Sequence, residues 1–198
     1  MATGVPIPDE KKFPRSRFLH RELSAILYDR QKNELIGNAV TFKAEWSEEN
    51  EDEWTFGGQS FFLRWGSYAI ESDPALELIF ELTCYCELKK KLVAMNVCYG
   101  EVKVINLKRE TIIVELQGGS PWNTLYIQKD DIRWERKTLI GRIQKAFSST
   151  VRSRFEIEVS LPSGKYMGSL LAMPDRCLVP KRSVHLWKGY REYLAFRS

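Results

Sequence analysis

Alternation of apolar and polar side chains is the feature that most constrains the fold of this chain. In Ala39–Trp46 the even positions are apolar and most odd positions are polar, and Arg154–Leu161 alternates without a fault. Because successive side chains of a strand point to opposite faces, each segment predicts a β-strand with one solvated face. Further β-rich segments are Leu23–Tyr28, Ser60–Trp65, Leu76–Glu87, Glu101–Leu107, Thr111–Leu116, Thr124–Gln128 and Val184–Phe196. Such short strands, separated by Gly, Pro, Asn and Asp, are typical of a sandwich or barrel.

Evidence for helices is sparse. Within Arg136–Phe147 apolar residues recur at helical spacing, although Gly141 weakens a helix there by about 1 kcal/mol. The expected fold is therefore mainly β: an antiparallel β-sandwich with at most one short helix. The first 17 residues, which contain three prolines, predict an extended N-terminal arm or linker, and residues 18–198 predict a single sandwich domain.

The charged residues divide unevenly along the chain. Residues 1–83 carry 9 basic and 15 acidic side chains, whereas residues 84–198 carry 21 basic and 11 acidic ones. Six of the acids lie in Glu45–Glu53, a segment without a basic residue. Because like charges repel, we expect this segment to be a solvated loop between two strands.

The residue types that support catalysis and metal binding are few. The sequence has two histidines, His20 and His185, which restricts acid–base chemistry and argues against an enzyme. The cysteines lack the CxxC pairs of a zinc module, so we expect them to pack as buried apolar groups. The loop aspartates form only one adjacent pair, so we expect no calcium dependence and no cofactor. The cysteines are Cys84, Cys86, Cys98 and Cys177, and the loop aspartates are Asp73, Asp130, Asp131 and Asp175.

Nothing in the sequence predicts export or insertion into a membrane. The segment Met1–Arg17 is polar and interrupted by prolines, unlike a signal peptide. The longest apolar runs are far shorter than the roughly 20 residues that span a bilayer as a helix. Together with the sparse cysteines, this predicts a cytoplasmic protein in a reducing compartment.

Basic residues suggest a surface that binds anions. The candidates are Lys89, Lys90 and Lys91 in an expected hairpin turn, followed by Lys137, Arg142 and Lys145. We interpret the lysine run first as protection of a strand end against unwanted pairing. The alternatives are peripheral contact with anionic membrane surfaces and a basic nucleic-acid-binding β-barrel, including a viral one. Nucleic acid is the less favoured of these partners.

The order of several segments resembles the C-terminal nephrocystin homology region of the nephrocystin family. The resemblance runs from Thr41 to Leu194, and no single segment of it is diagnostic. The segments are Thr41–Trp46, Trp54–Phe56, Ser72–Leu76, Leu78–Leu82, Gly100–Val104, Val114–Trp122, Phe155–Leu161, Leu171–Pro174 and Leu186–Leu194. The SH3 domain and coiled coil that precede this region in the family are not found in the sequence.

The resemblance implies a calcium-independent, C2-like β-sandwich that acts as a protein–protein interaction module. It implies a place in a scaffold at the ciliary base and transition zone, at cell junctions and on the cytoskeleton, with other nephrocystin-family proteins as partners. The family offers no catalytic residues to carry over. Because exposed aromatic and arginine side chains dominate many interfaces, we expect partner contacts at Trp122, Trp134 and Arg136.

Overall fold

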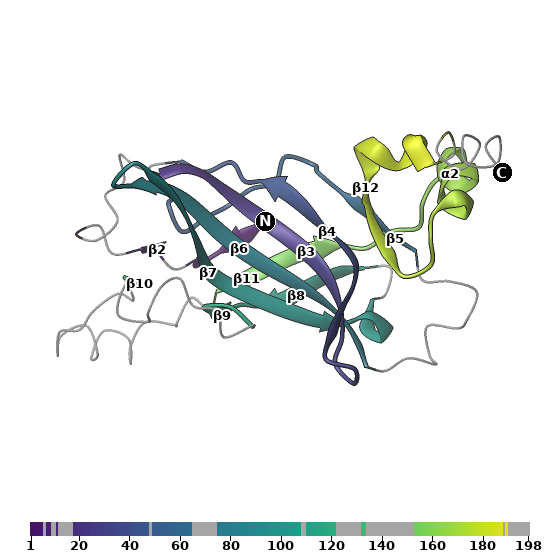
Figure 1. Cartoon of the computed structure of the whole chain (residues 1–198), viewed down its shortest axis with the longest axis horizontal. Helices are drawn as coiled ribbons and strands as arrows, with labels where there is room; N and C mark the ends of the chain where they lie inside the picture. The colour runs from purple at the N-terminus through teal and green to yellow at the C-terminus, as the bar shows by residue number, and fades with distance from the viewer. Residues whose placement is uncertain are drawn as a thin grey trace.

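The computed structural model describes residues 1–5, 7–8, 11, 18–47, 49–64, 75–107, 110–121, 132–133, 153–187 and 189. These residues form a mainly β structure in which two antiparallel layers face each other across one core (Figure 1). The expectation of an antiparallel β-sandwich is confirmed. Within the described part of the chain no helix is long and apolar enough to cross a membrane.

The larger layer is a five-stranded sheet in the order β4-β3-β6-β7-β9. Side chains of β3 and β6 alternate, so that Leu23 and Leu27 meet Leu82 and Leu78 across the ladder and point into the core. This is the period-2 pattern expected of a half-buried strand. The strands are β3 (Phe18–Asp29), β4 (Glu34–Lys43), β6 (Leu76–Leu88), β7 (Lys91–Lys103) and β9 (Gln117–Gly118).

The smaller layer has the order β1-β11-β8 and closes the core from the other side. Its strands are β1 (Ala2–Thr3), β8 (Thr111–Glu115) and β11 (Arg154–Glu158). Phe155 of β11 lies 5.1 Å from Phe80 of β6, measured between ring centroids. Trp54 and Thr55 connect the layers at one end, since Trp54 bridges to Ala2 and Thr55 to Glu45.

A small cap covers the other end of the molecule, beside β4. Strand β12 (Cys177–Pro180) pairs with β5 (Phe61–Arg64), and the Asn38 side chain of β4 donates a 2.9 Å hydrogen bond to the Leu178 carbonyl. The cap has its own core of Met173, Cys177, Val179 and Val184. It also contains η5 (Gly164–Tyr166), α2 (Met167–Ala172), η6 (Lys181–Ser183) and the helical residues 184–187. Elsewhere, β2 (Ile7–Pro8) pairs with β10 (Ile132–Arg133), and η3 spans Val104–Asn106.

Several expectations from the sequence need correction. The strand predicted over Val184–Phe196 is wrong in its described part, because residues 184–187 and 189 are helical. Val184 and Trp187, three positions apart on one helical face, both pack on the core of the cap. The strand predicted over Glu101–Leu107 ends at Lys103, where η3 begins. The described residues hold two short helices rather than at most one, and the helix predicted over Arg136–Phe147 lies outside them.

The segment predicted as an extended arm and the acidic segment predicted as a solvated loop both contribute to the packed structure. In the N-terminal arm, Ala2 and Val5 are members of the main core, and β1 pairs with β11. In the acidic segment, Glu51 is 8% exposed and its carbonyl accepts a buried hydrogen bond from Arg21. The loop is therefore not freely solvated throughout, because a buried arginine holds part of its backbone.

Candidate functional site: a groove between the two layers

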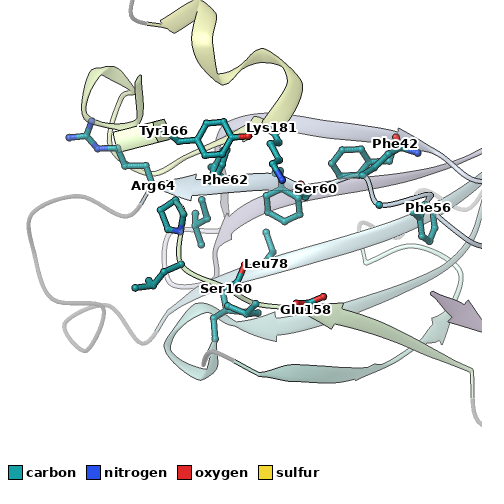
Figure 2. Close-up of a pocket in the computed structure, with 18 of the residues that line it drawn as sticks. Phe42, Phe56, Ser60, Phe62, Arg64, Leu78, Glu158, Ser160, Tyr166 and Lys181 are labelled. Carbon is teal, nitrogen blue, oxygen red and sulfur yellow. The ribbon is translucent and has the colours of Figure 1, made fainter. Parts of the chain in front are cut away.

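A groove with a volume of about 1460 Å³ opens between β5 and the end of β11, and we call it the interlayer groove. Its floor includes Leu23, Leu78 and Phe80 of the larger sheet. Figure 2 shows Ser60, Tyr166 and Lys181 on one side of the groove, Glu158 and Ser160 on the other, and Leu78 between them. The groove is thus bounded by two segments from different layers.

Strand β5 lies between two cores, and its side chains alternate between them. Phe61 and Leu63 pack against the main core, and the Phe61 ring lies 6.0 Å from that of Phe42. Phe62 points to the cap, where its ring lies 5.1 Å from that of Tyr166. The apolar run from Phe61 to Leu63 is explained by burial on both faces.

Among the described residues, the backbone of β5 is paired along one edge only. The Lys181 amide donates a 2.9 Å hydrogen bond to the Ser60 carbonyl, which fixes Ser60 and the alternate residues of β5 as those bonded to β12. The amide and carbonyl groups of Phe61 and Leu63 consequently point away from β12. Among the described residues, β5 pairs with no strand other than β12. The free edge follows the groove.

The end of β11 presents a second edge of the same kind. The Val159 amide bonds to the Glu110 carbonyl on the β8 side, whereas the Glu156 amide bonds to the Met1 carbonyl on the β1 side. Alternation therefore directs the backbone groups of Glu158 and Ser160 toward the β1 side. Within the described ranges neither residue has a backbone partner there, and both line the groove.

Arg64 fixes the cap to β5. Its NH1 group donates to the carbonyl oxygens of Leu170 and Leu171 at 2.8 and 2.6 Å, and its Nε lies 3.1 Å from an oxygen of Asp175. Asp175, considered above as a calcium ligand, is thus engaged in an ion pair. Arg64 holds the end of α2 in place through its NH1 and Nε groups.

Two other cations of the groove lie around one aromatic ring. The ammonium groups of Lys165 and Lys181 lie 4.9 and 5.9 Å from the Tyr166 ring centroid. Both side chains are exposed and line the groove. On the opposite wall lie Glu156 and Glu158, and the Met1 ammonium beside them interacts with Glu156. The net charge of these three groups is negative, opposite in sign to the two lysines.

Apolar side chains at the rim of the groove are unusually open to solvent. Leu161 is 62% exposed and Leu171 is 64% exposed, and both line the groove. Exposed leucines are ordinary on a protein surface when they are isolated. Here they are continuous with an apolar groove, an arrangement typical of a binding surface.

Of the binding residues predicted from the sequence, the structure describes only the three lysines Lys89, Lys90 and Lys91, and these lie away from the groove. Lys89 and Lys90 form the two-residue turn between β6 and β7, with φ angles of 51° and 64°, and Lys91 begins β7. Figure 1 places that turn at the end of the molecule opposite to β5, β12 and α2. The remaining candidates, Trp122, Trp134, Arg136, Lys137, Arg142 and Lys145, lie outside the described residues, as do Asp73, Asp130 and Asp131.

The cysteines are buried and carry free thiols, as expected. Burial raises the pKa of Cys84 to about 12 and also raises the pKa values of Cys86, Cys98 and Cys177. A thiol with a raised pKa is a poor nucleophile at neutral pH. In the described part of the chain, no three His, Cys, Asp or Glu side chains are grouped so as to hold a metal ion.

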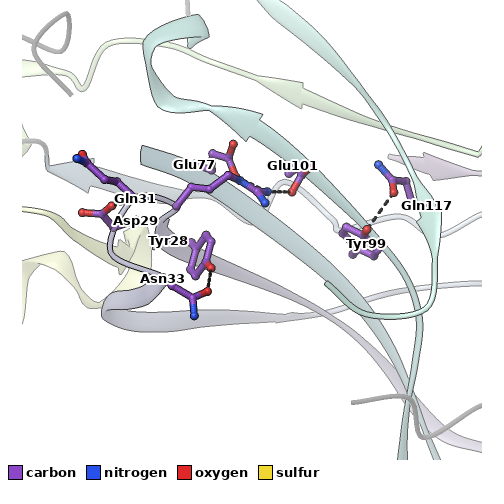
Figure 3. Close-up of polar contacts among 9 residues, drawn as sticks. Tyr28, Asp29, Gln31, Asn33, Glu77, Tyr99, Glu101 and Gln117 are labelled. Carbon is purple, nitrogen blue, oxygen red and sulfur yellow. Dashed lines mark hydrogen bonds and ion pairs between the residues drawn. The ribbon is translucent and has the colours of Figure 1, made fainter. Parts of the chain in front are cut away.

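On the outer face of the larger sheet, polar side chains connect neighbouring strands (Figure 3). Arg30 donates hydrogen bonds of 2.6 Å to both Glu77 and Glu101, joining the β3–β4 turn to β6 and β7. The hydrogen bond to Glu77 raises the pKa of the Arg30 guanidinium. Tyr99 donates a 2.9 Å hydrogen bond to Gln117 and so attaches β9. These contacts are structural.

Sequence reasoning did not single out the residues of the interlayer groove. The run Phe61–Leu63 was the available signal, because three consecutive apolar residues in a predicted strand indicate burial on both faces. The convergence of Lys165 and Lys181 depends on the fold of the cap, and no local sequence pattern predicts it.

No known protein family matches the sequence, and no curated protein matches it either. The resemblance to the nephrocystin homology region therefore rests on the segments quoted above. The geometry of the groove is the remaining guide to function.

Proposed function

We propose that the protein is a non-catalytic protein–protein interaction module that holds an extended segment of its partner in the interlayer groove. The observation that supports this function is a pair of backbone edges along one apolar groove that no described strand occupies: Phe61 and Leu63 on β5, and Glu158 at the end of β11 with Ser160 just after it. An added strand would satisfy the backbone groups of the edge that it joins, as in known strand-addition complexes.

The side chains of such a segment would alternate between two environments. Residues pointing inward would meet the partly buried lining residues Phe56, Phe61 and Leu63, and the next residues would point to solvent. Burial of apolar side chains would supply affinity, at roughly 25 cal/mol per Å² before the costs of association are subtracted. The module therefore selects an alternating apolar and polar segment.

A lipid chain is the weaker candidate for the groove. Its apolar tail would fill the same volume, but it would leave the amide groups of Phe61, Leu63 and Ser160 without hydrogen bonds once water is displaced. An unsatisfied buried amide costs about 1–3 kcal/mol. A polypeptide satisfies these groups and fills the groove at once.

The resemblance supports a specific class of partner within this proposal. Other nephrocystin-family proteins would bind the module in a scaffold at the ciliary transition zone and at cell junctions. Pull-down of nephrocystin-family proteins by the wild-type chain, and loss of that binding in a Leu161→Glu variant, would support this class. Absence of binding by the wild-type chain would remove it while leaving the groove to be tested separately.

The groove itself is tested with a phage-displayed peptide library selected on the full chain. We expect the selected peptides to share an alternating apolar pattern. Their binding should fall at least about tenfold in Ser160→Pro, which removes the backbone amide, and persist in Ser160→Ala, which keeps it. Thermal unfolding of both variants shows that the fold is retained. Peptides without alternation, or equal binding to both variants, would overturn the proposal.

The second candidate function is contact with anionic membranes through the lysine turn. It is favoured by the exposure of Lys89, Lys90 and Lys91 at one end of the molecule. Vesicles containing phosphatidylserine test it in flotation at low and high salt, since electrostatic binding weakens as ionic strength rises. No flotation at low salt would eliminate this candidate.

A further inference from the structure

We infer that the partner segment carries an acidic side chain that binds at Lys165 and Lys181, at the Tyr166 end of the interlayer groove. This inference rests on the proposed function and specifies the chemistry of the segment. It follows from the position of the two lysines, from the lack of an ion pair between them and any other described residue, and from the charge of the opposite wall.

The first step is the convergence of the two lysines. Lys165 belongs to η5 and Lys181 to η6, so different parts of the cap bring them to the Tyr166 ring. The negative face of an aromatic ring attracts an ammonium group within about 6 Å and restrains its position. The lysines therefore present positive charge at a defined place beside the groove.

The positive charge of these two lysines can interact with a ligand. Within the described residues, neither Lys165 nor Lys181 forms an ion pair, and both are exposed to solvent. Arg64, by contrast, is occupied by Asp175 and by carbonyls at the end of α2. Two neighbouring cations with no counter-ion in the described part of the chain create a positive potential that favours an anionic group on a ligand.

The charges of the two walls also determine the direction in which an acidic side chain of the bound segment points. Glu158 lies on the β11 wall, where it would repel a carboxylate, whereas the Met1 ammonium offsets the charge of Glu156. An acidic side chain on the bound segment is therefore favoured toward the cap wall and disfavoured toward the β11 wall. Such charge complementarity restricts the register of an added strand more than it raises affinity.

The experiment uses the same peptide library, selected in parallel on the wild-type chain and on Lys165→Glu/Lys181→Glu. We expect wild-type selection to enrich Asp or Glu at one position of the alternating pattern. Selection on the double variant should enrich Lys or Arg at that position. The acidic peptides should bind the double variant about tenfold or more weakly, with a loss that shrinks at high salt.

The matched control is Lys89→Glu/Lys90→Glu, which makes the same change of charge at the β6–β7 turn. We expect it to bind the acidic peptides within about twofold of the wild type, because exposed charges beyond a Debye length are screened. An equal loss in the control would mean that net charge, and not the Tyr166 site, governs binding, and would overturn the inference.

The outcomes separate the inference from the proposed function. Alternating peptides that are sensitive to Ser160→Pro but show no acidic preference would overturn the inference and leave the proposed function in place. Failure to select alternating peptides on the wild-type chain would overturn both. Native mass spectrometry would detect a fatty acid bound to the purified protein. If neither the acidic peptides nor the basic peptides displaced it, the groove would be assigned to an amphiphile instead.

Discussion

The guanidinium carbon of Arg21 lies 3.9 Å from the centre of the Trp46 ring. Arg21 is 4% exposed, and its NH1 group donates a 2.6 Å hydrogen bond to the Glu51 carbonyl. The same guanidinium lies 5.3 Å from the Trp54 ring. A single buried side chain thus joins β3 to the acidic segment and to the tryptophan that bridges β1.

Replacing Arg21 should destabilise the protein substantially. We expect Arg21→Ala to lower the free energy of unfolding by about 2–4 kcal/mol, because it removes a charge-assisted hydrogen bond and aromatic contacts in a buried site. Arg21→Lys should recover only part of this loss, since an ammonium lacks the planar guanidinium that lies over the ring. Urea denaturation measures the effect. A loss no larger than that of exposed Lys103→Ala would contradict the structural role.

Two glycines should respond to alanine in opposite directions. A Cβ on Gly100 would lie 2.6 Å from Cγ1 of Val114, so Gly100→Ala should destabilise the protein by about 1–3 kcal/mol. A Cβ on Gly168, in α2, meets nothing within 4 Å, so Gly168→Ala should raise stability by about 0.5 kcal/mol. Thermal denaturation of both variants tests the prediction, which fails if the two shifts share a sign.

The sequence predicted the strands whose apolar residues form a pattern within the strand itself. Leu76–Glu87 was expected as a strand and β6 spans Leu76–Leu88, because apolar residues fill its inner face throughout. The start of β4 was missed, because the alternation in the sequence begins at Ala39, whereas β4 spans Glu34–Lys43. In the structure Gly37 has a φ of 69°, where the β3–β4 register shifts, and its missing Cβ admits the Arg176 carbonyl.

The groove could not be predicted because it depends on contacts between distant segments. The pairing of Phe61–Arg64 with Cys177–Pro180 determines which edge of β5 is free, and no local pattern encodes that register. The same holds for Glu51, whose burial depends on Arg21. From the sequence alone, a run of acidic residues predicts a solvated loop. The burial of Glu51 follows only from its contact with a buried arginine on another strand.

The buried thiols should make stability depend on alkaline pH. The pKa of Cys84 rises from 9.0 to about 12 on folding, so its contribution is complete below pH 9 and is lost as the pH rises toward 12. The loss should approach about 1.4 kcal/mol per pH unit for this thiol. Urea denaturation at pH 7.5, 9 and 10 should show a shallower decline in Cys84→Ala than in the wild type. Equal slopes would contradict the assignment.

The native protein should also resist thiol reagents. All four cysteines are buried, and burial raises each thiol pKa, so we expect little reaction with Ellman's reagent at pH 7.5 without denaturant. All four thiols should react in 6 M guanidinium chloride, a condition that unfolds ordinary domains. Fast reaction of any thiol in the native protein would show that its strand opens more readily than its burial implies.

Leu161 and Leu35 offer a matched test of where a partner docks. They are 62% and 58% exposed, but only Leu161 lines the interlayer groove, whereas Leu35 lies on β4 near the β3–β4 turn. Glutamate at either position should change stability by no more than about 0.5 kcal/mol, as is usual for exposed sites. Leu161→Glu should nevertheless weaken binding of the selected peptides about tenfold or more, because it places a charge beside apolar side chains that must lose water. Leu35→Glu should leave binding unchanged. Fluorescence titration compares the two, and equal affinities would place the docking surface away from the groove, since the substitutions differ only in position.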